Sequence, residues 1–165
     1  MAALALQRAA RSWQFARTTH AAHAVQPEES GASAAEAMRL ALADAGEPLD
    51  QVGYINAHGT STPINDAVET VAIKGLFKKR AYQIPVTSTK SMVGHSLGAA
   101  GGLEAVACVR SITEGVVHAT VNYEHPDPQC DLDYVPNEAR RLDVRVALSN
   151  AFGFGGQNAC LVFRR

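Results

Sequence analysis

Hydrophobic and polar positions along the chain change period several times, from the spacing of a helix to that of a strand. Apolar residues at helical spacing between positions 31 and 45, followed by Gly46, are typical of one helix with its end signal. The same reasoning predicts helices over 31–45, 65–77 and 97–114, and strands over 52–57, 84–88, 116–122, 144–149 and 158–163. Residues 124–137, rich in Pro and Asp, predict a surface loop in which 132–135 could form a short strand. Strands that alternate with helices predict an α/β fold that ends in a hairpin.

Composition divides the 165 residues into two parts. Residues 1–27 hold nine alanines, three arginines and no acidic residue before Glu28, a composition typical of an organelle targeting segment and equally of a truncated or divergent start. Residues 28–165 are long enough for one domain. With a targeting segment the protein would enter a mitochondrion or plastid, and without one we expect a bacterial cytoplasmic protein.

Charge and cysteine usage exclude several classes of function. Fifteen basic and sixteen acidic residues give a formal charge of -1, so the chain has no basic field for nucleic acid. No apolar run approaches eighteen residues, which predicts no membrane span. Three cysteines without a Cys-x-x-Cys pair favour a reducing compartment over a disulfide framework or zinc site.

Residues 94–98 read Gly-His-Ser-Leu-Gly and satisfy the nucleophile elbow of serine hydrolases. The elbow needs a buried strand before it and an acid and a histidine after it, in that order. Ser96 follows a polar segment, and Glu114 lies only four residues before His118, too close for separate strand-end loops. A serine hydrolase is therefore the weaker interpretation of this motif.

Four ordered segments collect polar residues and glycines at the predicted ends of strands and helices. They read Asn-Ala-His-Gly-Thr-Ser-Thr-Pro at 56–63, Ser-Thr-Lys-Ser-Met-Val-Gly-His at 88–95, Leu-Gly-Ala-Ala-Gly at 97–101 and Ser-Asn-Ala-Phe-Gly-Phe-Gly-Gly at 149–156. From about Pro27 to Phe163 the chain resembles the C-terminal half of an elongating β-ketoacyl-acyl-carrier-protein synthase. The resemblance implies a thiolase-like fold, of which this chain is one half of the αβαβα layers.

The resemblance implies a decarboxylative Claisen condensation of malonyl-acyl carrier protein with an acyl thioester, as in fatty acid biosynthesis. His58 and His95 would stabilise the enolate oxygen that forms when malonyl loses carbon dioxide. Lys90 and Glu104 would support the histidines, although Lys90 could also be a solvated surface lysine. Phe154 would supply an oxyanion-hole N–H and gate the acyl pocket, or else be a buried aromatic in a turn.

Substrate and cation contacts are also implied by the resemblance. Thr60 and Thr62 would bind the phosphopantetheine arm that arrives on the acyl carrier protein, or act as local turn formers. A monovalent or divalent cation is expected at a cluster of four oxygen-bearing residues, for which a satisfied buried network is an equal alternative. The cluster consists of Asn56, Glu104, Ser149 and Asn150. No other cofactor is required.

The nucleophilic cysteine of the family lies in the half that this chain lacks. Cys108, Cys130 and Cys160 do not match its motif, so we expect no condensation by the chain alone. A complete protein would act on malonyl and acyl thioesters, bind acyl carrier protein and form a homodimer. The alternative is a non-catalytic partner or degenerate fragment that binds acyl carrier protein or a full-length synthase.

Overall fold

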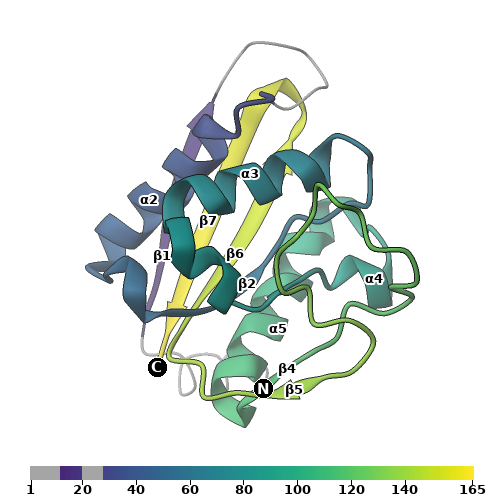
Figure 1. Cartoon of the computed structure of the whole chain (residues 1–165). Coiled ribbons are helices and arrows are strands. Elements are labelled where there is room, and N and C mark those ends of the chain that lie inside the picture. The colour runs from purple at the N-terminus through teal and green to yellow at the C-terminus, as the bar shows by residue number, and fades with distance from the viewer. Residues whose placement is uncertain (1–11, 20–27) are drawn as a thin grey trace.

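A computed structural model of the chain describes residues 12–19 and 28–165. Its five-stranded sheet has the order β1-β7-β6-β2-β3 (Figure 1). These strands span Ser12–Thr19, Gln157–Arg164, Val146–Gly153, Val52–Asn56 and Val86–Thr87. Pairing is parallel among β6, β2 and β3 and antiparallel where β7 joins β6 and β1. The parallel strands therefore all end at one edge, where α/β proteins place their sites.

Helices cover both faces of this sheet, which confirms the predicted α/β class (Figure 1). The helices are α2 (Ala32–Ala45), α3 (Asn65–Phe77), α4 (Lys90–Val93) and α5 (Ala100–Glu114). The first core lies between α2, α3 and one face of the sheet, and includes Met38, Ile55 and Ile73. The second lies between α5 and the other face, and includes Tyr54 and Ile112. Neighbouring residues of β2 thus enter opposite cores, as the alternation along a strand requires.

The periodicity that predicted the helices also explains their burial. In α2 the buried residues recur every three or four positions, and Gly46 closes the helix in the left-handed conformation with φ of 66°. Helix α5 begins at Ala100, after a 3₁₀ turn at Leu97–Ala99, instead of at Leu97 as predicted. None of the helices in the described ranges is long and apolar enough to cross a membrane.

Some of the strands differ from the sequence prediction. The strand expected over 116–122 is only Val116–Val117 (β4), which pairs with Arg140–Arg141 (β5) in a separate ribbon. No strand forms at 132–135, so this stretch is part of the expected loop, and Val135 at its end has a positive φ of 49°. Strand β1 was not predicted, and it lies within the segment 1–27. The remainder of that segment, including any targeting function, lies outside the described residues.

Candidate active site

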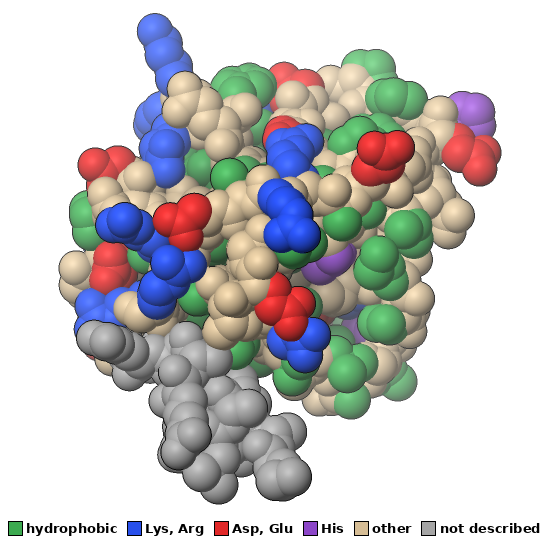
Figure 2. All heavy atoms as spheres, turned by 90° about the horizontal axis from the view of Figure 1, so that it is seen from below, with side chains coloured by type: hydrophobic (Ala, Val, Ile, Leu, Met, Phe, Trp, Pro, Cys, Tyr) green, Lys and Arg blue, Asp and Glu red, His purple; other side chains and the backbone are tan. Residues whose placement is uncertain are grey.

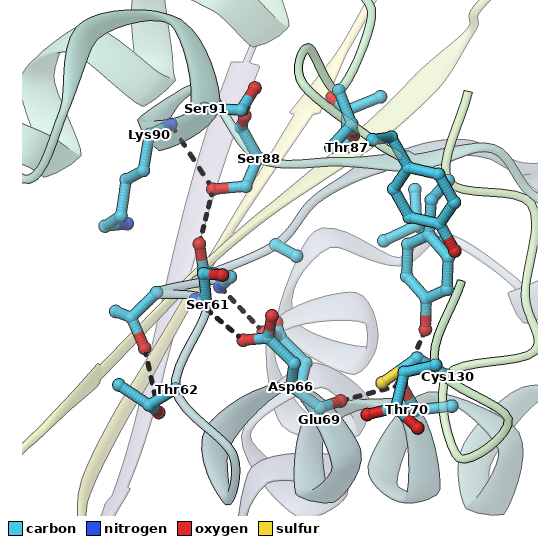
Figure 3. Close-up of a pocket in the computed structure, with 18 of the residues that line it drawn as sticks. Ser61, Thr62, Asp66, Glu69, Thr70, Thr87, Ser88, Lys90, Ser91 and Cys130 are labelled. Carbon is cyan, nitrogen blue, oxygen red and sulfur yellow. Dashed lines mark hydrogen bonds between the residues drawn. The ribbon is translucent and has the colours of Figure 1, made fainter. Parts of the chain in front are cut away.

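The predicted site residues meet at the carboxyl edge of the parallel strands. His58 follows β2 by two residues, and Lys90 opens α4 three residues after β3. The loops beyond these two strands line a cavity of about 890 Å³, together with residues 120–125 and part of α3. Figure 3 shows Lys90, Ser88, Ser61 and Thr62 on one side of this cavity and Cys130 with Thr70 on the other. The sheet topology therefore gathers segments that are distant in sequence.

The two predicted catalytic histidines lie side by side. The ring centroids of His58 and His95 are 5.9 Å apart with the planes nearly perpendicular, and the His58 ring also contacts Phe152. His95 Nδ1 accepts a hydrogen bond from the Leu97 N–H at 3.1 Å. A neutral imidazole whose Nδ1 is an acceptor carries its proton on Nε2. His95 thus has an Nε2–H that can be donated to a substrate.

His58 is held in the neutral form with the same tautomer. Burial, the Lys90 ammonium and then His95 lower the pKa of His58 to about 3. Lys90 Nζ lies 3.5 Å from His58 Nδ1, and an ammonium group can only donate, so Nδ1 is the acceptor. The proton of His58 is therefore on Nε2. Both rings are neutral donors, as stabilisation of an enolate oxygen requires.

Lys90 is fixed by a buried ion pair with Glu104 of α5. The Nζ to Oε1 distance is 2.5 Å, and the two side chains are only 6% and 1% exposed. Glu104 Oε2 has no hydrogen-bond partner among the described residues. A buried charge that loses its partner is strongly destabilising, so each residue holds the other in place. Lys90 is thus not a solvated surface lysine.

Glu69 of α3 is a site residue that the sequence reasoning missed. Its buried carboxylate accepts the backbone N–H groups of His58 and Gly59, each at 3.0 Å, and the Asn150 amide at 3.1 Å. Burial raises the pKa of Glu69, and these hydrogen bonds oppose the rise. The available signal in the sequence was a carboxylate three and four positions before the apolar residues Ala72 and Ile73, which places it on the buried face of the helix.

The predicted substrate threonines and gating phenylalanine are accessible. Thr60 and Thr62 line the cavity, and their hydroxyl oxygens are 3.4 Å apart. Thr62 also accepts the N–H of Asn65, the first residue of α3, at 3.3 Å. Phe154 is 80% exposed in the β6–β7 turn, which excludes the alternative of a buried turn aromatic. Gly155, with φ of 72°, lets the chain turn directly after it.

The structure does not bring the four expected cation ligands together. Asn56 and Ser149 are register partners on β2 and β6, and their alternation places both side chains toward α5, which carries Glu104. Asn150 points to the opposite face, where its amide contacts Glu69 and Met38 Sδ. On the α5 side Asn56 leaves an amide nitrogen unpartnered, which cannot ligate a cation. The four side chains therefore do not form one ligand set.

Ser96 lacks the surroundings of a hydrolase nucleophile. Helix α4 and Gly94 precede it where the elbow needs a strand. Its hydroxyl oxygen is buried and has no hydrogen-bond partner among the described residues, so no histidine is placed to take its proton. The structure contradicts the hydrolase interpretation.

The cysteines are unsuited to nucleophilic catalysis. Cys108 and Cys160 are buried in the two cores, and burial raises the pKa of both thiols. Cys130 is half-buried in the cavity wall, and burial raises its pKa as well. A catalytic thiolate needs a lowered pKa, so these three residues do not replace the missing nucleophile.

Comparison with known proteins shows to which family this chain is similar. The family described as "Beta-ketoacyl synthase, C-terminal domain" matches residues 12–124. The 3-oxoacyl-[acyl-carrier-protein] synthase 2 of Synechocystis is 54% identical over 92% of the chain and 36% of its own length. Nodulation protein E of Rhizobium is 56% identical over 86% of the chain and 35% of its length.

Solved structures agree with these relatives. A β-ketoacyl synthase from Burkholderia phymatum superimposes with a TM-score of 0.85 at 42% identity, over 92% of this chain and 36% of that one. A type II polyketide ketosynthase solved with its acyl carrier protein has a TM-score of 0.89 at 40% identity, over 92% and 37%. The chain thus spans just over a third of the length of these relatives. The chain belongs to the β-ketoacyl synthase family and carries its C-terminal domain.

Proposed function

We propose that this chain supplies the decarboxylation half of a β-ketoacyl-acyl-carrier-protein synthase. The observation that carries the proposal is the pair of neutral imidazoles, His58 and His95, each with an Nε2–H free for a substrate. When a malonyl thioester loses carbon dioxide, the electron pair of the broken C–C bond enters an enolate whose oxygen becomes negative. Preorganised donors aimed at such an oxygen contribute about 3–4 kcal/mol each.

Lys90 would keep the pair ready for this work. Its ammonium occupies His58 Nδ1 and disfavours a second proton on that ring, while Glu104 keeps the ammonium in place. Thr60 and Thr62, at the exposed rim of the cavity, would bind the polar phosphopantetheine arm of a carrier protein. The polyketide ketosynthase with a similar fold was solved in complex with its acyl carrier protein, which supports that partner here.

Condensation also requires a thiolate, which a further part of the protein would supply. Hydrophobic side chains gather on the side that carries α4, at the right of Figure 2. The exposed large hydrophobic residues in and beside α4 and α5 are Met92, Val93, Leu97, Leu103 and Val106, which are 45% to 78% exposed. An apolar face of this kind is typical of a protein interface. We propose that the part found in the longer relatives covers this face.

Homodimer formation and a cytoplasmic location belong to the same proposal. The three cysteines are unpaired, as in proteins of a reducing compartment.

A non-catalytic role is the competing function, and the absence of a competent thiolate in this chain is the observation in its favour.

A chimera tests the proposal. This chain would replace the matching part of the Synechocystis relative, and release of carbon dioxide from malonyl-acyl carrier protein would be measured. We expect activity, and a loss of about 10²–10³-fold in His58→Ala and in His95→Ala. The control is Arg39→Ala, an exposed residue paired with Glu36 on α2. A folded chimera that decarboxylates equally well without either histidine would disprove the role, and a folded but inactive chimera would favour the non-catalytic alternative.

A further inference from the structure

One serine hydroxyl joins the two loops that carry His58 and Lys90. Ser88 Oγ donates a hydrogen bond to the Gly59 carbonyl at 3.0 Å and accepts one from the Lys90 N–H at 3.3 Å. Figure 3 shows these two bonds in line between Lys90 and the loop that contains Ser61. Gly59 directly follows His58, so a single oxygen connects the peptides beside both groups.

The contact between the loops is unusually close. Gly59 has a φ of 42°, and a Cβ at this position would lie 2.6 Å from the Ser88 Cβ and 2.9 Å from its Oγ. Only glycine fits there without movement. Ser88 is 9% exposed, so little water is available to replace its hydrogen bonds.

Other contacts of these loops do not replace this link. Asn56 Oδ1 also joins the two segments, because it accepts the Thr89 N–H at 3.3 Å, but this bond starts from the end of β2 and does not reach the peptide that follows His58. The Ala57 N–H bonds to the Thr87 carbonyl at 2.7 Å, which is where pairing between the two chain segments ends. Glu69 binds the backbone beside His58 but belongs to α3, so it does not fix that loop relative to Lys90. Beyond Thr87, the hydrogen bonds of Ser88 extend the connection between the two segments as far as the residues beside His58 and Lys90.

We propose that Ser88 is a positioning residue that sets the 3.5 Å separation between Lys90 Nζ and His58 Nδ1. The part of this inference that concerns catalysis rests on the function proposed above. The part that concerns the protonation of His58 does not, because it follows from the distance between two charges.

Removal of the hydroxyl should let the loops separate. If the separation of Lys90 and His58 grows from 3.5 Å to about 6 Å, the repulsion that opposes a proton on His58 weakens by roughly 40%. We expect the pKa of His58 to rise in Ser88→Ala, by only part of its total shift, because burial is the larger cause of that shift. We also expect kcat for decarboxylation to fall about tenfold, because the two catalytic side chains are then less well positioned.

Three variants and a control separate positioning from simple loss of stability. Ser88→Thr keeps the hydroxyl and should preserve the wild-type behaviour. Gly59→Ala keeps Ser88 but forces the loops apart, and should reproduce the effect of Ser88→Ala. The control is Ser33→Ala, because Ser33 also donates one hydrogen bond, to Glu28 at 2.8 Å, and accepts one, from Asn158 at 3.2 Å, outside the cavity.

The imidazole NMR signals of His58 would be followed from about pH 7 down to the lowest pH at which the 165-residue chain stays folded, since the pKa of His58 is about 3, and kcat would be measured in the chimera. Protonation of His58 at a higher pH than in the wild type, in Ser88→Ala and Gly59→Ala but not in Ser88→Thr or Ser33→Ala, would support the proposal. Unchanged protonation in both disruptive variants would overturn it. If the wild-type chimera is inactive, the proposed function fails while the NMR series still decides this inference.

Discussion

The buried pair of Lys90 and Glu104 offers the sharpest stability test, since the chain contains an exposed pair of the same length. Lys90 Nζ and Glu104 Oε1 are 2.5 Å apart with side chains 6% and 1% exposed. Arg110 and Glu114 on α5 are also 2.5 Å apart, but their side chains are 67% and 49% exposed. The two pairs therefore differ in burial and not in distance.

Replacing Glu104 by Gln leaves the Lys90 ammonium buried without a counter-charge. We expect a loss of about 3–5 kcal/mol in the free energy of unfolding, which is a large part of the roughly 5–15 kcal/mol of a typical domain. Glu114→Gln should cost less than about 1 kcal/mol, because water screens the exposed pair. The double variant Lys90→Met with Glu104→Gln should lose less than the sum of the single variants, since neither buried charge is then left alone.

Urea unfolding followed by circular dichroism would give the free energies of the wild type, of Glu104→Gln, Glu114→Gln and Lys90→Met, and of the double variant, by linear extrapolation. The reasoning would be refuted if Glu104→Gln cost no more than Glu114→Gln. It would also be refuted if the double variant lost the full sum of its two components, because the charges would then be uncoupled.

Two further predictions concern protonation and backbone strain. Because the pKa of His58 is about 3 in the folded chain and 6.5 in the reference state, the unfolded chain binds the extra proton between these values. The stability contributed by neutral His58 is therefore complete above about pH 6.5 and declines toward pH 3. In urea unfolding, the free energy of unfolding of His58→Asn should decline less steeply over this pH range than that of the wild type. Equal declines in the two proteins would contradict the lowered pKa of His58. Gly31→Ala should cost at least about 1 kcal/mol more than Gly46→Ala. Both glycines have φ near 65°, but a Cβ at Gly31 would lie 2.9 Å from backbone atoms of α3, whereas Gly46 faces open space. Equal costs in thermal or urea unfolding would show that the close approach relaxes freely.

Much of the fold could be read from periodicity because its elements bury regular patterns. The helices α2, α3 and α5 and the strand β2 lie close to their predicted ranges. Each carries apolar residues at the spacing that puts them on the face packed against the core. Strand β1 was not predicted. Its residues form a strand next to β7, a partner about 140 positions away that no local pattern reveals.

The residues of the candidate site were also predictable from the sequence only in part. His58, His95 and Lys90 stood in motifs that predicted their chemistry, and the structure brings them together. Glu69 carried only the weak signal of a carboxylate on a buried helical face. Asn150 was grouped with Ser149 as an expected cation ligand, but neighbouring residues of a strand point to opposite faces of the sheet.

The amino-acid sequence by itself determined the class of fold, the family and the identity of the reacting groups, because side-chain chemistry and apolar spacing are local properties. The tertiary structure decided which groups act on one another. The depressed pKa of His58, the burial of the Lys90–Glu104 pair and the Ser88 link depend on distances of a few ångströms between separate loops. Electrostatic and hydrogen-bond energies change steeply over such distances, so only the packed sheet and its helices could set them.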